Sequence, residues 1–244
     1  MSHRLPPALS CHRLPVVARW LAAGSVLLSA PLAAAQASPD VSKLFQGAFN
    51  GAFAGTEPTQ AQPPAAADPR AGVPFTRSRS VTSTVERGLA DNLATNFTLR
   101  FAMRDPAGFL RSGKAREVAT RELKARGFPE DSVAGSTALL LAVAWELANA
   151  GTLSGEENAA ILRQVTTSFR GHPLEREGDE QRQIQADPRL LTVGLWLEEA
   201  YLREPFPAQK EALSDAVQRD MQTISKNDMR RKRVTDEGFV DRPS

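Results

Sequence analysis

The apolar run from Ala138 to Trp145, inside the stretch 131–150, constrains this chain more than any other feature of its sequence. Alanine and leucine fill most of the run, and both are strong helix formers. A helix that is apolar on every side is normally buried. The run is much shorter than the roughly 20 apolar residues that a membrane-spanning helix needs. The sequence therefore predicts a central core helix over 131–150.

The residues that flank this stretch favour helix ends at both of its borders. Asp131 or Ser132 can cap the first turn, because their side-chain oxygens accept hydrogen bonds from free backbone N–H groups. Phe128 can pack back onto that turn. Gly151 follows the last helical residue, so we expect it to take the left-handed position that ends many helices.

Residues 1–37 have the pattern of a secretory signal peptide. Three arginines precede the apolar stretch 20–32, and residues 35–37 fit the small-residue pattern before a cleavage site. We expect cleavage after Ala37, with residues 33–35 as the alternative site. A periplasmic or secreted protein follows from this pattern, and no later stretch predicts an integral membrane span.

Removal of the signal peptide changes the charge balance of the chain. Residues 1–37 hold three of the 30 basic residues and none of the 28 acidic ones, so the net charge changes from +2 to −1. This balance gives no reason to expect nucleic acid as a partner. The single cysteine, Cys11, also lies in this segment. The mature chain therefore has no disulfide and must fold by packing alone.

The segment 38–75 combines a phenylalanine repeat with a linker. Phe45, Phe49 and Phe53 recur every four residues, which places them on one side of a helix. This stripe indicates either a docking segment for a partner or membrane surface, or a local segment of the chain's own fold. Proline, alanine and glutamine dominate residues 56–74, a composition typical of a disordered linker.

The helical domain is expected over residues 76–228. Apolar residues at helical spacing predict helices over 81–104, 114–126, 154–170, 188–203 and 207–226, in addition to the central one. Ser154 and Glu157 form a capping-box pattern at the start of one of them. The polar stretch 174–187 is expected to be a loop. We therefore predict an all-α bundle of about five or six helices around the helix 131–150, followed by a basic and polar tail over 229–244.

Several classes of chemistry are absent from the mature chain. His172 is its one histidine, so metal sites built from histidine or cysteine are excluded, and a catalytic triad would depend on a histidine in an expected loop. No glycine pattern typical of phosphate or dinucleotide binding occurs. The sequence predicts no metal and no cofactor.

The polar end of the central helix holds the remaining candidates. Glu146 would become a proton donor if burial raised its pKa, whereas an ion pair with Arg121 or Arg126 would make it structural. Trp145 and Trp196 can line a groove for small apolar ligands or simply fill the core. In the core, an indole N–H group needs a hydrogen-bond partner, and Glu146 and Asn149 are the nearby candidates.

Part of the chain resembles a group of secreted bacterial helical proteins that is classed as a domain of unknown function. The core segment of this family is matched here by Asp131, Val133, Ala134, Trp145, Asn149 and Gly151. A second short motif is similar at Thr235, Gly238 and Phe239. The resemblance covers roughly residues 75–240. It implies a signal peptide, a low-complexity stretch and a helical domain, and it assigns no activity and no site residues.

Two functions from different classes remain as hypotheses. The favoured one is a non-enzymatic interaction or scaffold domain of the bacterial envelope, because the chain combines an export signal, a phenylalanine repeat and few reactive side chains. The alternative is a hydrolase of envelope polymers that uses the Glu146 carboxyl group. A carrier of small apolar ligands, bound near Trp145 and Trp196, is a further possibility.

Overall fold

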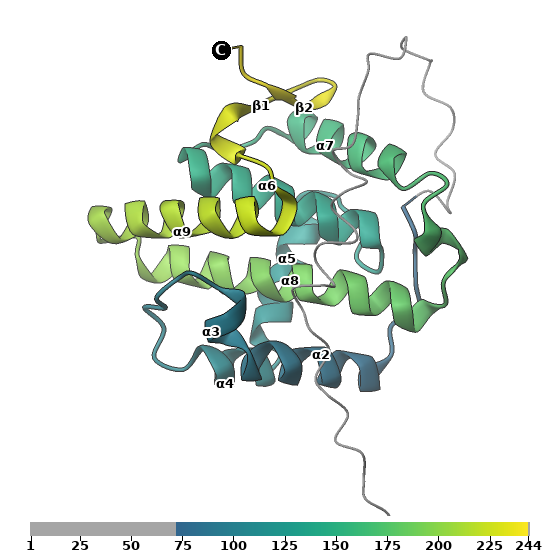
Figure 1. Cartoon of the computed structure of the whole chain (residues 1–244), viewed down its shortest axis with the longest axis horizontal. Helices are drawn as coiled ribbons and strands as arrows, with labels where there is room; N and C mark the ends of the chain where they lie inside the picture. Colours follow the sequence, from purple (N-terminus) through teal and green to yellow (C-terminus); the bar gives the residue numbers. More distant parts are fainter. Residues whose placement is uncertain (1–71, 244) are drawn as a thin grey trace, which may run out of the picture. The chain divides into compact units, whose positions relative to one another are not determined.

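The computed structural model describes residues 72–243, which fold into an all-α domain with one small hairpin (Figure 1). Its α-helices are α2 (Arg79–Asp91), α3 (Leu93–Asn96), α4 (Pro106–Arg111), α5 (Lys114–Ala125), α6 (Val133–Asn149), α7 (Gly155–Ser168), α8 (Asp179–Leu202) and α9 (Pro207–Ser225). Two 3-10 turns, η1 (Pro173–Arg176) and η2 (Met229–Arg231), precede α8 and the strands β1 (Lys232–Thr235) and β2 (Gly238–Asp241). The predicted fold class is confirmed.

Helix α6 is the predicted core helix. Every residue from Val133 to Ala144 is buried, and α5, α7, α8 and α9 all pack against this helix. Ser132 caps its first turn by accepting a hydrogen bond from the Gly135 N–H group at 3.2 Å. Within residues 72–243, no helix has the length and apolar character that a membrane crossing requires.

Helix α8 begins earlier than its sequence indicates, because one side of its polar first half is buried against the rest of the domain. The stretch 179–187 is helical rather than a loop, and Pro188 lies within the helix. The Asp187 carboxylate is fully buried, where it accepts hydrogen bonds from Arg77 and Arg116 at 2.6 and 2.8 Å and from Gln183 at 2.9 Å. Charge pairing thus stabilises a polar helix that hydrophobic periodicity does not reveal.

The predicted helix over 81–104 is wrong in its second half. Helix α2 ends at Asp91, and α3 adds one further turn. Residues 97–104, which we name the strap, leave the helix and alternate apolar and polar side chains. Phe97 and Leu99 are buried, whereas Thr98 and Arg100 are exposed. This alternation is typical of extended chain with one face on a core, and helical spacing of the same phenylalanines concealed it.

The tail predicted as basic and polar is folded over residues 229–241. Strands β1 and β2 pair antiparallel, with Val234 opposite Phe239, and the hairpin packs against α7. The Gln164 side chain donates to the Phe239 carbonyl at 3.1 Å and accepts from its N–H group at 2.9 Å. An amide side chain therefore satisfies the outer edge of β2, a contact that no local sequence pattern shows.

The first described residues, 72–75, lie along the start of α6. The carbonyl groups of Gly72 and Val73 accept hydrogen bonds from Ala134 and Val133 at 3.0 and 3.1 Å. Those two N–H groups belong to the first turn of α6, where no helical carbonyl is available to them. The predicted signal peptide, the predicted linker and the phenylalanines Phe45, Phe49 and Phe53 lie outside the described residues.

Candidate functional site

A hollow of about 330 Å³ lies where the end of α5, the end of α6 and the start of α7 meet. It contains Glu146, the one candidate acid that the sequence singled out. The lining residues are Glu122, Ala125, Arg126, Glu146, Thr152, Leu153, Gly155 and Asn158. We treat this hollow as the candidate site because it brings polar side chains from three helices together.

The Arg126 guanidinium group occupies the centre of these polar contacts. It donates to Glu146 at 2.7 and 3.2 Å, to Glu122 at 2.8 Å and to the Asn158 side-chain oxygen at 3.0 Å. Burial disfavours the charge of Arg126, but its hydrogen bonds and ion pairs with Glu146 and Glu122 outweigh burial and raise its pKa. The group is thus a permanent cation shared among three helices.

Glu146 is an acceptor at this site. Both of its carboxylate oxygens receive hydrogen bonds from Arg126, and one also receives the Leu153 N–H group at 2.9 Å. A general acid has to carry a proton that it can give to a substrate. Both Glu146 oxygens are instead engaged as acceptors, and these contacts hold the loop between α6 and α7 in place. The expected ion pair with Arg126 is present, and Arg121 takes no part in it.

Trp145 and Asn149 contact the tail. The Trp145 indole N–H group donates to the Lys232 carbonyl at 3.0 Å. The Asn149 side-chain amide donates to the carbonyls of Trp145 and Met229 at 2.9 and 3.1 Å. The polar end of α6 therefore connects two parts of the protein. Glu146 contacts Arg126, whereas Trp145 and Asn149 contact residues at and just before the start of the hairpin.

Trp196 and His172 lie away from this hollow. Trp196 is fully buried in the core, and its indole N–H group makes no hydrogen bond with the described residues. The His172 ring accepts the Leu174 N–H group at 3.2 Å and so caps η1. Burial and the charge of Arg189 lower the pKa of His172, which keeps the ring neutral in this role.

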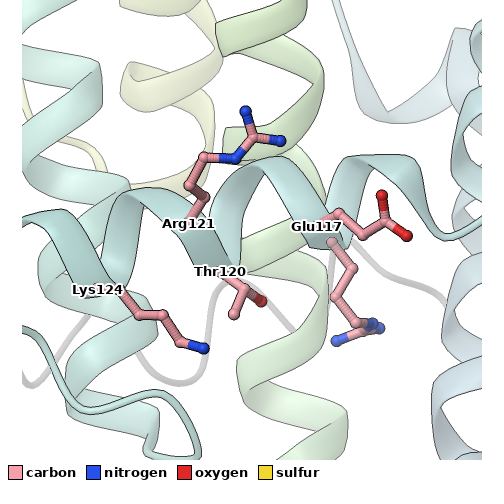
Figure 2. A pocket seen from close by; sticks show the side chains of 5 residues that line it. Glu117, Thr120, Arg121 and Lys124 are labelled. Atoms are coloured by element: carbon pink, nitrogen blue, oxygen red, sulfur yellow. The ribbon is translucent and has the colours of Figure 1, made fainter.

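A second hollow, of about 440 Å³, lies along the outer face of α5. Figure 2 shows Glu117, Thr120, Arg121 and Lys124 projecting from this single helix. Arg121 points to one side of the helix and Lys124 to the other, so their charges do not converge on a common point. This surface lacks the convergent polar groups that are typical of small-molecule sites.

Three large apolar side chains in the residues around the turn between α8 and α9 are exposed, which sequence reasoning missed. Tyr201, Leu202 and Phe206 have exposed fractions of 75%, 36% and 51%. We name these three residues the apolar corner. Pro205 and Pro207 lie beside them and restrict the backbone of the turn. Tyr201 and Leu202 fall within the helix predicted over 188–203, and only the tertiary fold shows that nothing described covers them.

Among residues 72–243, no group of three or more histidine, cysteine, aspartate or glutamate residues is arranged to hold a metal ion. Comparison with protein-family models, with curated proteins and with solved structures finds no match for this chain.

Proposed function

We propose that this chain is an exported, non-enzymatic interaction domain of the bacterial envelope, related to the secreted helical proteins that its core segment resembles. The apolar corner carries the proposal. Tyr201 and Phe206 lie at either end of the turn between α8 and α9. Exposed aromatic side chains are typical of binding surfaces, where they supply much of the binding energy. The partner is a protein that offers a complementary apolar surface.

The charged side chains of the candidate site support the same proposal. Arg126 at the end of α5 pairs with Glu122 of the same helix and with Glu146 on α6, and Asp187 is likewise paired with two arginines. Side chains in such pairs stabilise the fold and are held away from chemistry on a substrate. The export signal in residues 1–37 supports the envelope as the location.

Cross-linking from the apolar corner tests this proposal. A photoreactive residue at Phe206 is expected to capture one discrete partner from envelope extracts. The double variant Tyr201→Ser/Phe206→Ser is expected to abolish partner recovery while the fold remains, because these side chains are exposed. Arg233→Ser, at an exposed position on β1, is the matched control and should recover the partner normally. Unchanged recovery with the double variant would refute the role of the corner.

The phenylalanine segment is tested separately. Deletion of residues 38–60 is expected to weaken partner recovery if Phe45, Phe49 and Phe53 form a second docking element. The hydrolase alternative predicts that Glu146→Gln removes an activity on envelope polymers, whereas the interaction domain has no such activity to lose.

A further inference from the structure

Two buried carboxyl groups hold the strap, residues 97–104, onto helices α8 and α9. The strap has no strand partner among the described residues, so its backbone N–H groups depend on side chains. Glu199 on α8 serves one end and Asp220 on α9 serves the other. Figure 1 shows this segment as the loop between α3 and α4, beside the turn that joins α8 and α9.

The Glu199 end is fully satisfied. The Glu199 carboxylate is fully buried and accepts the N–H groups of Ala102 and Met103, each at 2.8 Å. Arg203 donates to the same carboxylate at 2.9 and 3.0 Å and also to the Arg100 carbonyl. Glu199 thus accepts four hydrogen bonds, two from backbone N–H groups and two from the paired guanidinium, and attaches this end of the strap strongly to α8.

The Asp220 end is incomplete. One Asp220 oxygen accepts the Thr98 N–H group at 2.9 Å and the Thr98 hydroxyl at 2.7 Å. The other oxygen is buried and has no hydrogen-bond partner among the described residues. Burying a charge costs much more than burying a neutral carboxyl group, unless the charge is paired and hydrogen-bonded. The surroundings of Asp220 at this end of the strap therefore favour its protonated, neutral form over its ionised form.

We propose that Asp220 and Thr98 form a pH-sensitive latch, which is closed while Asp220 carries a proton and which loosens when Asp220 ionises. Thr98 is exposed, so movement of residues 97–99 brings water directly to the carboxylate. The Glu199 end remains attached during this movement. Opening exposes the buried side chains of Phe97 and Leu99, which adds apolar surface to this end of the domain.

The surroundings of Asp220 set the direction of this effect. Burial raises the pKa of Asp220 above 3.8, against the hydrogen bonds from Thr98 and the positive charge of Arg219. Arg219 is the neighbour of Asp220 on α9. The strap residue that contacts Asp220 is Thr98, which is uncharged. At the end of α8, Glu199 and Arg203 form an ion pair with each other. The pKa of Asp220 is thus higher in the folded state than in the unfolded state. Its protonated form therefore stabilises the closed state fully at pH values below the unfolded-state pKa. That contribution is lost as pH rises through the folded pKa.

Amide hydrogen exchange in the intact mature protein tests the latch. After correction for intrinsic rates, the opening constant of the Thr98 amide is expected to rise as pH is raised from about 4 to about 8. The rise is limited to about tenfold per pH unit, because one proton is involved. The amides of Ala102 and Met103 are internal controls that should not follow this change.

Asp220→Asn provides the decisive comparison, because asparagine keeps an oxygen acceptor for Thr98 and cannot ionise. Its Thr98 opening is expected to be independent of pH. A carbon NMR titration of the Asp220 carboxyl group in the unmodified sequence should give the same midpoint as the Thr98 opening. The latch is refuted if Thr98 opening is independent of pH, if the variant keeps the pH dependence, or if the two midpoints differ. None of these outcomes depends on whether the apolar corner binds a partner.

Discussion

At the residue scale, Arg126 shows how one charge joins three helices. It contacts Glu122 on its own side of the hollow, Glu146 on α6 and Asn158 on α7. Its side chain is 11% exposed, so solvent screens these contacts only weakly. Removing the cation would leave two carboxylates facing each other in a partly buried position.

Arg126→Met is therefore expected to destabilise the domain by about 2 to 5 kcal/mol, the range for removing one partner of a largely buried ion pair. Urea unfolding followed by circular dichroism measures this loss. Arg121→Met is the matched control on the same helix, because Arg121 is exposed and makes no hydrogen bond or ion pair with the described residues. Equal losses in the two variants would contradict the role of Arg126.

Ala150 is a second residue whose role differs from expectation. The left-handed position at the end of α6 is taken by Ala150, with a φ angle of 49°, and not by Gly151. Gly151 is needed for another reason. A Cβ atom there would lie 3.0 Å from the Trp145 ring, so the glycine lets the ring pack closely against the backbone.

Ala150→Gly is expected to stabilise the domain by about 0.5 to 1 kcal/mol, because glycine adopts the left-handed conformation without strain. Thermal unfolding measures the gain. Ala159→Gly, at an exposed position inside α7, is expected to destabilise by about 1 kcal/mol, since glycine is a poor helix former. The same substitution thus changes the free energy of unfolding in opposite directions at the two positions, because only Ala150 has the left-handed backbone conformation. A destabilised Ala150→Gly variant would contradict it.

Sequence reasoning located the candidate site only in part. The Glu146–Arg126 pair was one of two alternatives, since residues on adjacent predicted helices can meet. The contribution of Asn158 and the attachment of Asn149 to Met229 depend on how α7 and the tail fold back on α6. Those contacts join residues far apart in the chain, so spacing within a segment cannot reveal them.

At the element scale, α5 and α8 pack closely at one glycine. A Cβ atom on Gly194 would lie 1.9 Å from the Ala115 carbonyl oxygen, which is too close for any side chain. Ala115 is itself fully buried. Small residues on both helices thus allow the two backbones to approach, in the way that ridges of one helix enter grooves of another.

Gly194→Ala is expected to cost about 3 kcal/mol, since the helices must separate or the backbone must shift. Chemical denaturation measures the loss. Gly88→Ala on α2 is the matched control, because an added Cβ atom there meets nothing within 4 Å. The control should stabilise by about 1 kcal/mol through helix propensity. A neutral Gly194→Ala variant would show that the α5–α8 contact is more adaptable than the structure indicates.

The sequence predicted apolar helices well and polar elements poorly. The capping box at Ser154 and Glu157 is present, as expected. Helix α6, whose residues are apolar on every side, also lies where it was predicted. The first half of α8, the strap and the hairpin were not predicted, because buried side-chain hydrogen bonds to Asp187, Glu199 and Gln164 fix them. Hydrophobic periodicity carries no information about such contacts.

At the scale of the whole molecule, the first and last described segments both close on α6. Residues 72–75 satisfy its first N–H groups, and the hairpin region receives hydrogen bonds from Trp145 and Asn149 at its other end (Figure 1). Val73 and Phe75 are buried in the same core as α6. Val73 has a φ angle of 57°, which is strained for a β-branched residue and indicates that its surroundings hold it firmly.

A variant that begins at residue 72 after a new start is expected to fold, whereas one that begins at residue 76 should be less stable by about 3 kcal/mol. The second variant loses the buried side chains of Val73 and Phe75 and the two carbonyl acceptors for α6. Denaturant unfolding compares the two proteins. Equal stability would show that residues 72–75 contribute little to the fold.

The closure of α6 at both ends has a consequence for how the protein is made. The chain emerges from the ribosome in order, and α6 is complete long before the residues near Phe239 have been synthesised. Until then, Trp145 and Asn149 lack their backbone partners in the tail. Native closure of this end of α6 is therefore completed only after the hairpin has emerged.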